Sequence, residues 1–507
     1  MRVFFAFGIV SWLLVVYGFI PAIRYDLFFR WFVGPLLLFF SAYYLLSFIQ
    51  NLFYKRFDLT KHFACVENFW ASQKDGGGKK GEPSVDVFLP ICGEELSVLR
   101  NTWQHVAALP YVNKKVYVLD DTKDQDSRKE QEVMAKQYGF EYLSRPDRGY
   151  MKKAGNIRYG FERSSGEFIV ILDADCAPHP DFIRELLPYM EHASNDDSGK
   201  RIGIVQSPQY FDMGKKIKRE QPLAYGAAHS QEAFYRIIEV ARDRLDATIC
   251  CGSNAIYRRE ALAQIGGASL QEHSEDAHTG FDLQALGWTV RYVPVILGIG
   301  TCPNDPHAYF HQQHTWCTGS LFPFMGRKFW KAQVSWKTKL SYITGFLYYF
   351  HHPLTLLFSF QLFWTLFFYN DYINLAGAII FLPYMIWGFA YMLAFPISRF
   401  GRGAFYSYFI QLYSCSHSIV AAIFKSNTTR VATNSKQPGA SRAFKQATFS
   451  AIIYLLAYTA LIMFMAYSGK LHPLNYNYLT IQFWVLYNTI LSTSLVVLLL
   501  RTYFRKR

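Results

Sequence analysis

The sequence contains little charge for its length. Only 18% of its 507 residues are Asp, Glu, Lys or Arg, against about 25% in an ordinary soluble domain. Hydrophobic residues reach 51% and aromatic residues 18%, which excludes a disordered chain. The mean hydropathy is only +0.04, too low for a protein that lies wholly in a bilayer. The composition therefore indicates several membrane helices together with one sizeable water-facing domain.

The sequence also lacks any C-x-x-C pair among its eight cysteines. A zinc ribbon or a thioredoxin-type motif is therefore absent at the sequence level. All eight cysteines fall in segments that we place on the cytosolic side or at its membrane surface, where thiols stay reduced. Structural disulfides are not expected.

Positive charge is in excess, with 52 Lys and Arg against 38 Asp and Glu, a net charge of +14. A nucleic-acid-binding protein would gather such charge in one stripe interleaved with aromatic residues. Here the basic residues cluster at the ends of apolar runs, as the positive-inside rule predicts for membrane proteins. We therefore expect a membrane protein with no nucleic-acid partner.

Six apolar runs are long enough to cross a bilayer as helices. A cleaved signal peptide is the competing interpretation of the first run, but no small-x-small cleavage site precedes Pro21. His351, His352 and Pro353 interrupt the third run, so we expect them to face the protein interior. The six predicted spans are Met1–Ile20, Leu27–Phe53, Tyr342–Phe368, Leu375–Ile397, Ala447–Tyr467 and Leu479–Leu500.

Ala404–Phe424 is less apolar and carries Gln411 and His417. We expect a helix that lies in the membrane interface, with a true span as the alternative. With six spans, the outer loops hold only Arg24 and Lys470 as basic residues. Both termini and the large domain are then cytosolic, and the protein is a multi-pass protein of the plasma (inner) membrane.

This topology divides the chain into three parts. Residues 1–53 form two transmembrane helices, and residues 54–340 form the cytosolic domain, with interfacial helices near its end. Residues 341–507 form a membrane region with four spans, the interfacial helix 404–424 and a polar linker, 425–446.

The cytosolic part alternates short apolar runs with helical segments, which predicts an α/β domain with a mostly parallel, mixed sheet. The predicted strands are Val85–Leu89, Lys115–Leu119, Phe168–Leu172 and Ile202–Gln206. Ligands bind beyond the carboxyl ends of such strands, where this sequence places Asp121 and the Asp173-Ala174-Asp175 motif. Paired carboxylates suit Mg²⁺ or Mn²⁺, although a lone D-x-D is weak evidence because loops favour Asp.

Two further polar segments follow. Ser274-Glu275-Asp276 precedes a predicted helix, where Ser274 could be a simple N-cap instead of part of a site. Gln312 to Trp316 lies on a helix-like segment shortly before the membrane. His307, His311 and His314 follow an i, i+4, i+7 spacing, so a zinc-binding or transport protein is a competing class.

These motifs together resemble a known family. Asp121, Asp173-Ala174-Asp175, Ser274-Glu275-Asp276 and Gln312-x-x-Thr315-Trp316 resemble the D, D-x-D, T-E-D and Q-x-x-R-W series of processive family 2 glycosyltransferases. Lys153-Ala154-Gly155-Asn156 and Cys251-Gly252-Ser253 look like the K-A-G-N and F-C-G-S elements of cellulose synthase catalytic subunits. The resemblance covers about residues 84 to 330 and the membrane plan on both sides.

The resemblance implies a GT-A fold, a UDP-sugar donor, a growing β-linked polysaccharide as acceptor and a polymer channel. The Cys-Gly-Ser element favours UDP-glucose. Asp276 is then the general base, and Asp173 and Asp175 hold Mg²⁺ or Mn²⁺. The resemblance also implies two sets of binding residues. The donor would be bound by Glu94, Asp121, Lys153, Asp173, Thr433 and Lys436, and the acceptor by Glu275, Gln312 and Trp316.

The chain departs from the family pattern at several positions. Ser274 replaces Thr, and Thr315 replaces an Arg that is expected to help hold the diphosphate. Two alternatives follow: either His314 or Arg327 compensates, or donor binding is weaker. Cys92 stands where an aromatic residue usually meets the uracil.

Two segments outside the catalytic motifs also bear comparison with the family. The linker 425–446, with Thr433 and Lys436, looks like the family's gating loop. Arg501 and Arg505 have the R-x-x-x-R spacing of a cyclic di-GMP-binding domain, but we interpret them as positive-inside anchors and expect no fused regulator.

Two enzyme classes remain as alternatives to a processive β-glucan synthase. One is a non-processive membrane glycosyltransferase that acts on a lipid carrier, which would share the D-x-D motif but need neither Trp316 nor a closing loop. The other is a synthase of the hyaluronan or poly-N-acetylglucosamine type. Membrane lipid is an expected partner, and accessory export proteins are a further partner class that stays open.

Overall fold

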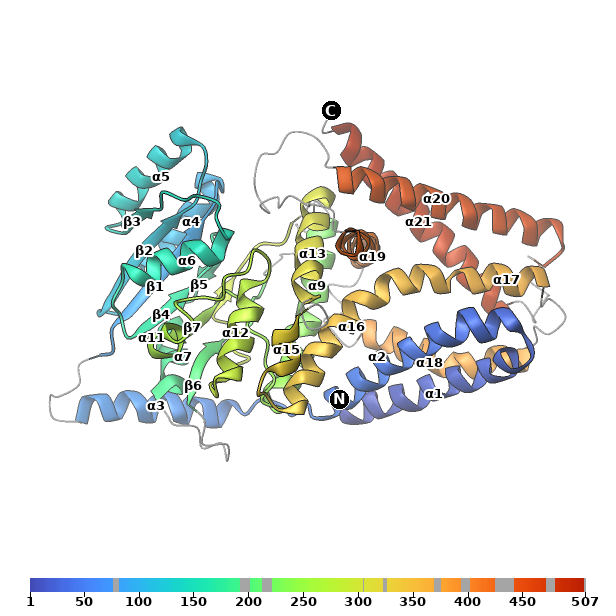
Figure 1. Cartoon of the computed structure of the whole chain (residues 1–507), viewed down its shortest axis with the longest axis horizontal. Helices are drawn as coiled ribbons and strands as arrows, with labels where there is room; N and C mark the ends of the chain where they lie inside the picture. Colours follow the sequence, from blue (N-terminus) through green and yellow to red (C-terminus); the bar gives the residue numbers. More distant parts are fainter. Residues whose placement is uncertain are drawn as a thin grey trace.

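The computed structural model describes residues 1–75, 82–191, 201–211, 221–303, 305–321, 326–368, 375–393, 402–424, 442–470 and 479–505. An α/β part and a helical part lie at opposite ends of an elongated molecule (Figure 1). Further helices lie between them. The predicted combination of an α/β domain with membrane-type helices is confirmed.

The α/β part contains a seven-stranded sheet in the order β3-β2-β1-β4-β7-β6-β8. The first four of these strands are parallel, whereas β7 runs antiparallel to both β4 and β6. The seven strands are β1 (Val85–Ile91), β2 (Lys114–Asp120), β3 (Glu141–Ser144), β4 (Phe168–Ile171), β6 (Ile202–Gln206), β7 (Ala255–Arg258) and β8 (Thr289–Tyr292). β5 (Ala177–Pro178) and β9 (Gly298–Ile299) form a separate small ribbon.

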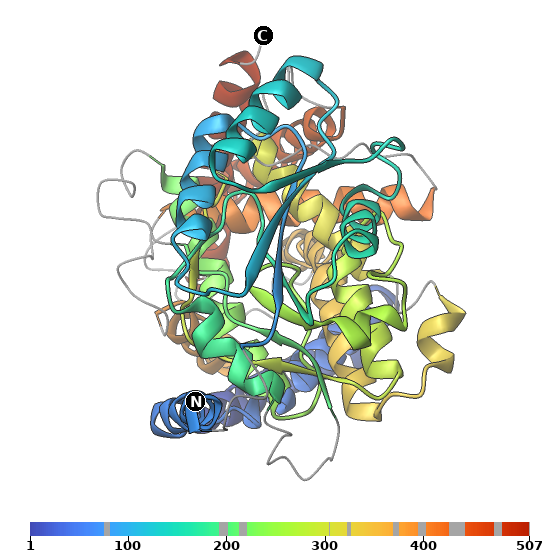
Figure 2. The ribbon, with the colours of Figure 1, turned by 90° about the vertical axis from the view of Figure 1, so that its left-hand side faces the viewer.

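Helices cover both faces of the sheet, which explains why β1 is buried along its whole length and lacks polar alternation. On one face, Val87 and Val118 pack with Trp103 and Leu186. On the other, Phe88 and Ile169 pack with Ile157 and Leu283. The helices of this part include α3 (Leu59–Asp75), α4 (Leu96–Ala107), α5 (Gln125–Gln137), α6 (Lys152–Glu162), α7 (Phe182–Glu191), α11 (Arg259–Ala263) and α12 (Glu275–Ala285). Figure 2 shows the sheet between these layers.

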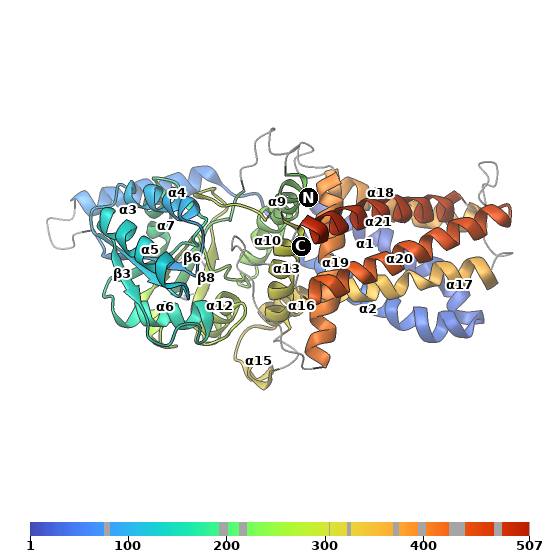
Figure 3. The same ribbon diagram turned by 90° about the horizontal axis from the view of Figure 1, so that it is seen from above.

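The helical part contains three helices that are long and apolar enough to cross a membrane: Arg2–Tyr25, Phe29–Leu52 and Arg442–Tyr467. They correspond to α1 (Arg2–Tyr25), a π-helical turn followed by α2 (Gly34–Leu52), and α20 (Arg442–Tyr467). Shorter apolar stretches lie within α18 (Leu375–Leu393) and α21 (Leu479–Arg505). The predicted span 342–368 is divided between α16 (Trp336–Phe358) and α17 (Phe360–Phe368). α1 begins, and α21 ends, on the side that faces the sheet (Figures 1 and 3).

The helices that cross the space between the two parts include α9 (Pro222–Ala233), α13 (Pro306–Ser320) and α19 (Arg402–Ile423). Figure 1 views α19 along its axis, whereas α16, α17 and α18 extend lengthwise, and Figure 3 shows the same crossing from above. α19 packs against both α9 and α13, and Ser414 Oγ donates a hydrogen bond to Phe310 O at 2.6 Å. This orientation is the one expected for a helix in the membrane interface.

All four strands predicted from the sequence are present, within two residues at each end. The antiparallel β7 was not predicted, because Ala255–Arg258 follows a Gly- and Cys-containing loop and is too short to show a period. β3 was also missed, since Glu141–Ser144 has only one apolar aliphatic residue.

Candidate active site

Polar residues from three parallel strands converge at one edge of the sheet. Glu94 follows β1, Asp121 follows β2, and Asp173 and Asp175 follow β4. The carboxyl ends of β1, β2 and β4 lie side by side, and the Asp121 N–H donates to Ile91 O at 2.9 Å. The structure therefore brings these four carboxylates to a common edge, where ligands of such sheets bind.

Lys153, on the first turn of α6, connects several of the acidic residues. Its Nζ lies 2.6 Å from Asp173 Oδ1, 3.0 Å from Gly252 O and 3.8 Å from Glu275 Oε1. Burial alone would lower the pKa of Lys153, but the carboxylates of Asp173, Glu275 and Asp276 outweigh it and raise the pKa. Lys153 is therefore a permanent cation at the centre of the site.

Asp276 is the second residue of α12 and lies beside this cation. Its Oδ1 accepts a hydrogen bond from the Ala277 N–H at 2.8 Å. Burial, and then the neighbouring Glu275 carboxylate, raise the pKa of Asp276 to about 7. A carboxylate with a pKa near the working pH is well suited to accept and release a proton.

The negative charges of Asp173 and Asp175 are compensated by different partners. Asp173 pairs with Lys153, and its N–H donates to Ser253 Oγ at 2.9 Å. Asp175 accepts a hydrogen bond from Thr301 Oγ1 at 2.9 Å, and burial followed by the Asp173 charge raises its pKa to about 6. A divalent cation would relieve this repulsion, so the two carboxylates fit Mg²⁺ or Mn²⁺ that also takes ligand phosphate oxygens and water.

No group of three or more His, Cys, Asp or Glu side chains within the described ranges is arranged to hold a metal ion. The histidines of α13 diverge: the His307 and His311 rings contact each other, whereas His314 Nε2 lies 3.4 Å from His417 Nδ1. The zinc-site alternative therefore finds no support among these residues.

Asp121 is held by a buried ion pair that the sequence analysis missed. Arg145 donates to both of its carboxylate oxygens, at 2.9 and 2.8 Å, and the Gly149 N–H donates to it at 3.0 Å. Arg145 is only 1% exposed. Arg145 directly follows β3 at the same edge of the sheet. This position would have indicated a site residue, but β3 was not predicted from the sequence.

Ser274 occupies the N-cap position of α12, as one of the two interpretations expected, but its side chain makes no capping hydrogen bond and its φ is +50°. Its hydroxyl instead packs against α13 at Gly319, where a Cβ atom would lie 1.9 Å from Ser274 Oγ. The Ser-Glu-Asp segment is therefore positioned by contact with the α13 helix.

α13 carries two of the three predicted acceptor-binding residues, Gln312 and Trp316, whereas Glu275 begins α12. Gln312, Thr315, Trp316 and Glu275 all line one cavity. Thr315 Oγ1 donates to His311 O at 3.0 Å. Burial, and then His417, lower the pKa of His314 to about 4, so His314 is neutral at pH 7 and cannot supply the charge of the missing arginine.

One cavity of about 2350 Å³ connects the acidic site with the helical part. It begins at Glu94, Asp121 and Asp173 and passes Trp316 on α13. It continues between the helices of the helical part, where its lining includes Trp12, Tyr44, Tyr348, His351, His352, Tyr384, Tyr458 and Asn488. The prediction that His351 and His352 face the interior is consistent with this lining.

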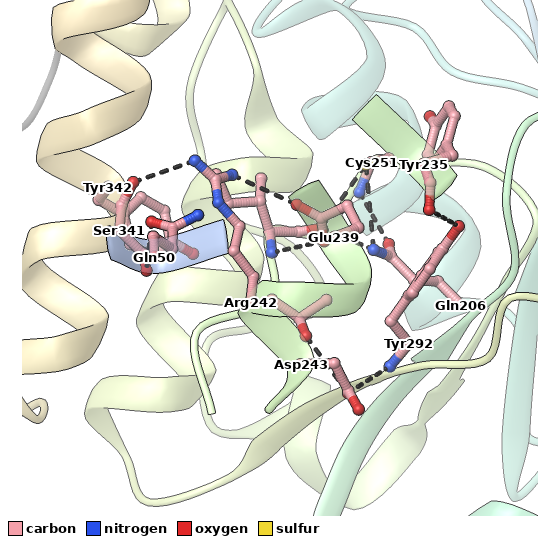
Figure 4. A network of polar contacts seen from close by, with 12 residues as sticks. Gln50, Gln206, Tyr235, Glu239, Arg242, Asp243, Cys251, Tyr292, Ser341 and Tyr342 are labelled. Carbon is pink, nitrogen blue, oxygen red and sulfur yellow. Dashed lines mark hydrogen bonds and ion pairs between the residues drawn. The ribbon is translucent and has the colours of Figure 1, made fainter. Parts of the chain in front are cut away.

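A buried polar network joins the site to the helical part (Figure 4). Gln206 accepts from the Cys251 N–H at 2.9 Å and donates to Ile249 O at 2.6 Å. Glu239 accepts from the Ile249 N–H and pairs with Arg242, both at 3.2 Å. These contacts fix the loop that continues into Gly252 and Ser253.

The network then reaches two helices of the helical part. Arg242, in α10 (Glu239–Asp243), donates to Ser341 O of α16 at 3.1 Å. Ser341 Oγ in turn donates to Gln50 Oε1 of α2 at 3.1 Å. Ion pairs and hydrogen bonds thus run without interruption from the loop beside Lys153 to the end of α2.

Two predicted donor-binding residues, Thr433 and Lys436, lie outside the described residues. Glu94 lines the cavity, and its Oε2 accepts from the Cys92 N–H at 2.6 Å. Arg327 is exposed on α15 (Arg327–Lys331) and does not belong to the described cavity lining.

Comparison with known proteins gives one family match. Residues 86–266 match the family described as Glycosyl transferase family 2. Cellulose synthase 1 of Komagataeibacter xylinus is 31% identical over 272 residues, which is 52% of this chain and 17% of that protein. The cellulose synthase catalytic subunit of Pseudomonas fluorescens is 27% identical over 301 residues, 57% of this chain and 39% of that protein.

The chain therefore spans less than two fifths of the length of these relatives. Among solved structures, a mannosyltransferase from Pyrobaculum calidifontis in complex with GDP-Man and Mn²⁺ is 15% identical, with a TM-score of 0.48 and coverage of 75% of this chain and 100% of that one. The family resemblance that the motifs predicted is confirmed.

We expect Gly252→Ala to abolish catalysis. Gly252 has a φ of +75°, and a Cβ atom there would lie 2.6 Å from Asp276 Oδ2. The matched control is Gly287→Ala, because Gly287 has a φ of +89° and no atom within 4 Å of the added Cβ. Both variants bear the backbone cost of roughly 1–2 kcal/mol, so thermal unfolding should shift in both, whereas transfer from a nucleotide-sugar donor should be lost only in Gly252→Ala. Equal activity of the two variants would contradict the assigned contact.

Proposed function

We propose that this chain, which carries a family 2 glycosyltransferase domain and resembles cellulose synthase catalytic subunits, polymerises a sugar from a UDP-sugar into a β-linked polysaccharide. The growing polymer leaves through the chain's own cavity. The observation that carries the proposal is the single cavity that extends from Asp276 past Trp316 into the helical part. UDP-glucose is the proposed donor.

Donor binding uses the acidic edge of the sheet. Arg145 fixes the orientation of the Asp121 carboxylate, whose oxygens can then accept hydrogen bonds from the nucleoside. Lys153 offers its ammonium to the diphosphate from its position beside Asp173. Asp173 and Asp175 would hold Mg²⁺ or Mn²⁺, which supplies positive charge to the leaving diphosphate when it is bound.

Asp276 is the proposed general base. It takes the proton from the acceptor hydroxyl as that oxygen attacks the anomeric carbon, and the bond to the diphosphate breaks with inversion. The Lys153 ammonium nearby stabilises the charged form of Asp276, while Glu275 on the same turn raises its basicity. The raised pKa makes Asp276 a stronger base than an exposed aspartate.

Trp316 and Gln312 are proposed to hold the acceptor end at the cavity entrance. The flat face of an indole suits the apolar face of a pyranose ring. Beyond them the cavity is lined mainly by aromatic rings and neutral polar groups such as Tyr348 and Gln411, which can contact sugar rings and hydroxyls without binding them in one register.

The lining also distinguishes charged from uncharged polymers. Within the described residues, the part contributed by α1, α2 and α16 to α21 contains no Asp, Glu, Lys or Arg. A polymer with a carboxylate in every repeat, such as hyaluronan, would lose hydration there without a compensating charge. The cavity therefore favours an uncharged polymer. A non-processive enzyme that modifies a lipid carrier has no use for so long a cavity.

The helical part is proposed to span the inner membrane with both termini and the α/β part in the cytosol. The start of α1 and the end of α21 lie on the side that faces the sheet (Figure 3), and the basic residues favour that side. The decisive test of function is to incubate membranes that contain the full chain with each labelled UDP-sugar and to determine the product's sugar, linkage and length. A product of single-sugar additions to lipid would overturn processivity.

Asp276→Asn should keep donor binding and lose turnover. A missing general base lowers the rate by about 10²–10⁴-fold, whereas UDP affinity should change little. Glu130→Gln is the control, since Glu130 lines the same cavity and is exposed on α5. Turnover above about a tenth of the wild-type rate in Asp276→Asn would exclude this role.

The rate should depend on pH through Asp276. Only the deprotonated carboxylate accepts a proton, and its pKa is raised to about 7 by burial and Glu275. kcat/KM should therefore fall about tenfold per pH unit below the midpoint and level off above it. Glu275→Gln removes a negative neighbour and should move this midpoint to lower pH. A profile that is flat across the range would rule out Asp276 as the titrating group.

Asp173→Ala and Asp175→Ala should each remove the metal-dependent part of UDP affinity. Calorimetric titration of UDP with and without Mn²⁺ measures this part directly. Asp181→Ala serves as the control, because Asp181 is a 43% exposed acid that lies six residues beyond Asp175 and near His179. Unchanged metal dependence in both site variants would show that the cation binds elsewhere.

A further inference from the structure

A basic and aromatic surface lies where the α/β part meets the helical part. It is formed by residues 326–340, which we name the α15–α16 junction. This segment contains five Lys or Arg residues and no Asp or Glu. Trp330 is 49% exposed and Trp336 is 68% exposed. Arg327, Lys331 and Lys337 are exposed as well.

Contacts with α12 hold the α15–α16 junction in place. Phe329 is 1% exposed, and its ring stacks on Phe281 of α12 with centroids 5.1 Å apart. Lys328 pairs with Asp282 of the same helix at 2.7 Å, and Lys339 Nζ donates to Trp330 O at 2.9 Å. The outward side chains are therefore presented by a fixed backbone. Figure 3 shows α15 projecting from the side of the molecule.

Its depth relative to a bilayer follows from one hydrogen bond. Ser341 of α16 contacts Gln50, which lies two residues before the end of the candidate span Phe29–Leu52. Trp336 precedes Ser341 by five residues, or about 7.5 Å of helix. The polar headgroup layer is about 5–8 Å thick on each side of the hydrocarbon core. With α2 placed in the membrane as proposed, Trp336 and Lys337 at the start of α16 lie within the headgroup layer.

We propose that the α15–α16 junction binds the headgroups of anionic phospholipids. Tryptophan and lysine are the residues that favour this depth, tryptophan for its amphipathic ring and lysine for the lipid phosphate. The proposal rests on the proposed membrane placement of α2.

The test is a binding measurement that needs no glycosyl transfer. The full chain in neutral detergent is titrated with short-chain phosphatidylglycerol or phosphatidylcholine, and thermal unfolding reports binding, because a ligand of the folded state raises Tm. The wild type should respond to phosphatidylglycerol at lower concentration, and high salt should weaken that preference. An equal response to both lipids would overturn the proposal.

Lys331→Ser with Lys337→Ser tests the site itself. Each lysine near an anionic surface contributes about a fivefold gain in affinity, so the double variant should lose up to about thirtyfold for phosphatidylglycerol and little for phosphatidylcholine. Lys129→Ser with Lys136→Ser on α5 is the control, since these exposed lysines lie far from the helical part (Figure 1). An unchanged response of the junction variant would refute the site, as would a preference for an acidic peptide over the lipid.

Discussion

The Lys153 ammonium is the interaction on which the arrangement of the site depends. It contacts Asp173 from β4, Glu275 from α12 and the Gly252 carbonyl from the loop before β7. These three elements are distant in the sequence, and without a cation between them their carboxylates would repel each other. One charge therefore holds the D-x-D segment and the Ser-Glu-Asp segment at a fixed separation.

The backbone around this cation is strained in the way that functional sites often are. Met151 and Lys152, just before it, have φ values of +50° and +47°. Asn254 and Ser274 also lie in the left-handed region. Each such residue costs roughly 1–2 kcal/mol. The cost is offset by fixed contacts, such as those of Asn254, which donates to Pro208 O at 3.1 Å.

The second constraint is the polar network that ties the α/β part to the helices. Glu239 and Arg242 are both nearly fully buried, and removing either charge would leave its partner uncompensated. Because Glu239 and Gln206 hold the Ile249–Cys251 backbone, a shift of α2 or α16 would be transmitted to the loop that carries Gly252 (Figure 4). The helices that line the cavity and the loop beside Asp276 are thus mechanically connected.

The sequence predicted those features that reside in local pattern. Continuous apolar runs predicted β1 and β4, because both faces of the sheet are covered. The acidic residues that follow the strands predicted the edge of the sheet at which the candidate site lies. Features that depend on contacts between distant segments could not be predicted from the sequence. The Arg145–Asp121 pair cannot be predicted without β3. The role of the Ser274 hydroxyl stayed open between a helix cap and a site residue, because nothing in the local sequence shows that Gly319 packs against it.

Thr315 leaves α13 without the positive charge that the arginine of the family motif would bring. The family arginine would stand on α13, but the described residues there offer only neutral groups to the cavity: Gln312, Gln313, Thr315, Trp316 and Ser320. Two cations instead line the cavity from the first turn of α6, Lys152 and Lys153. Lys152 lies 3.4 Å from the exposed Glu272, a weak pairing that a diphosphate can replace. Among the described residues of α6 and α13, the positive charge at the cavity therefore comes from the first turn of α6.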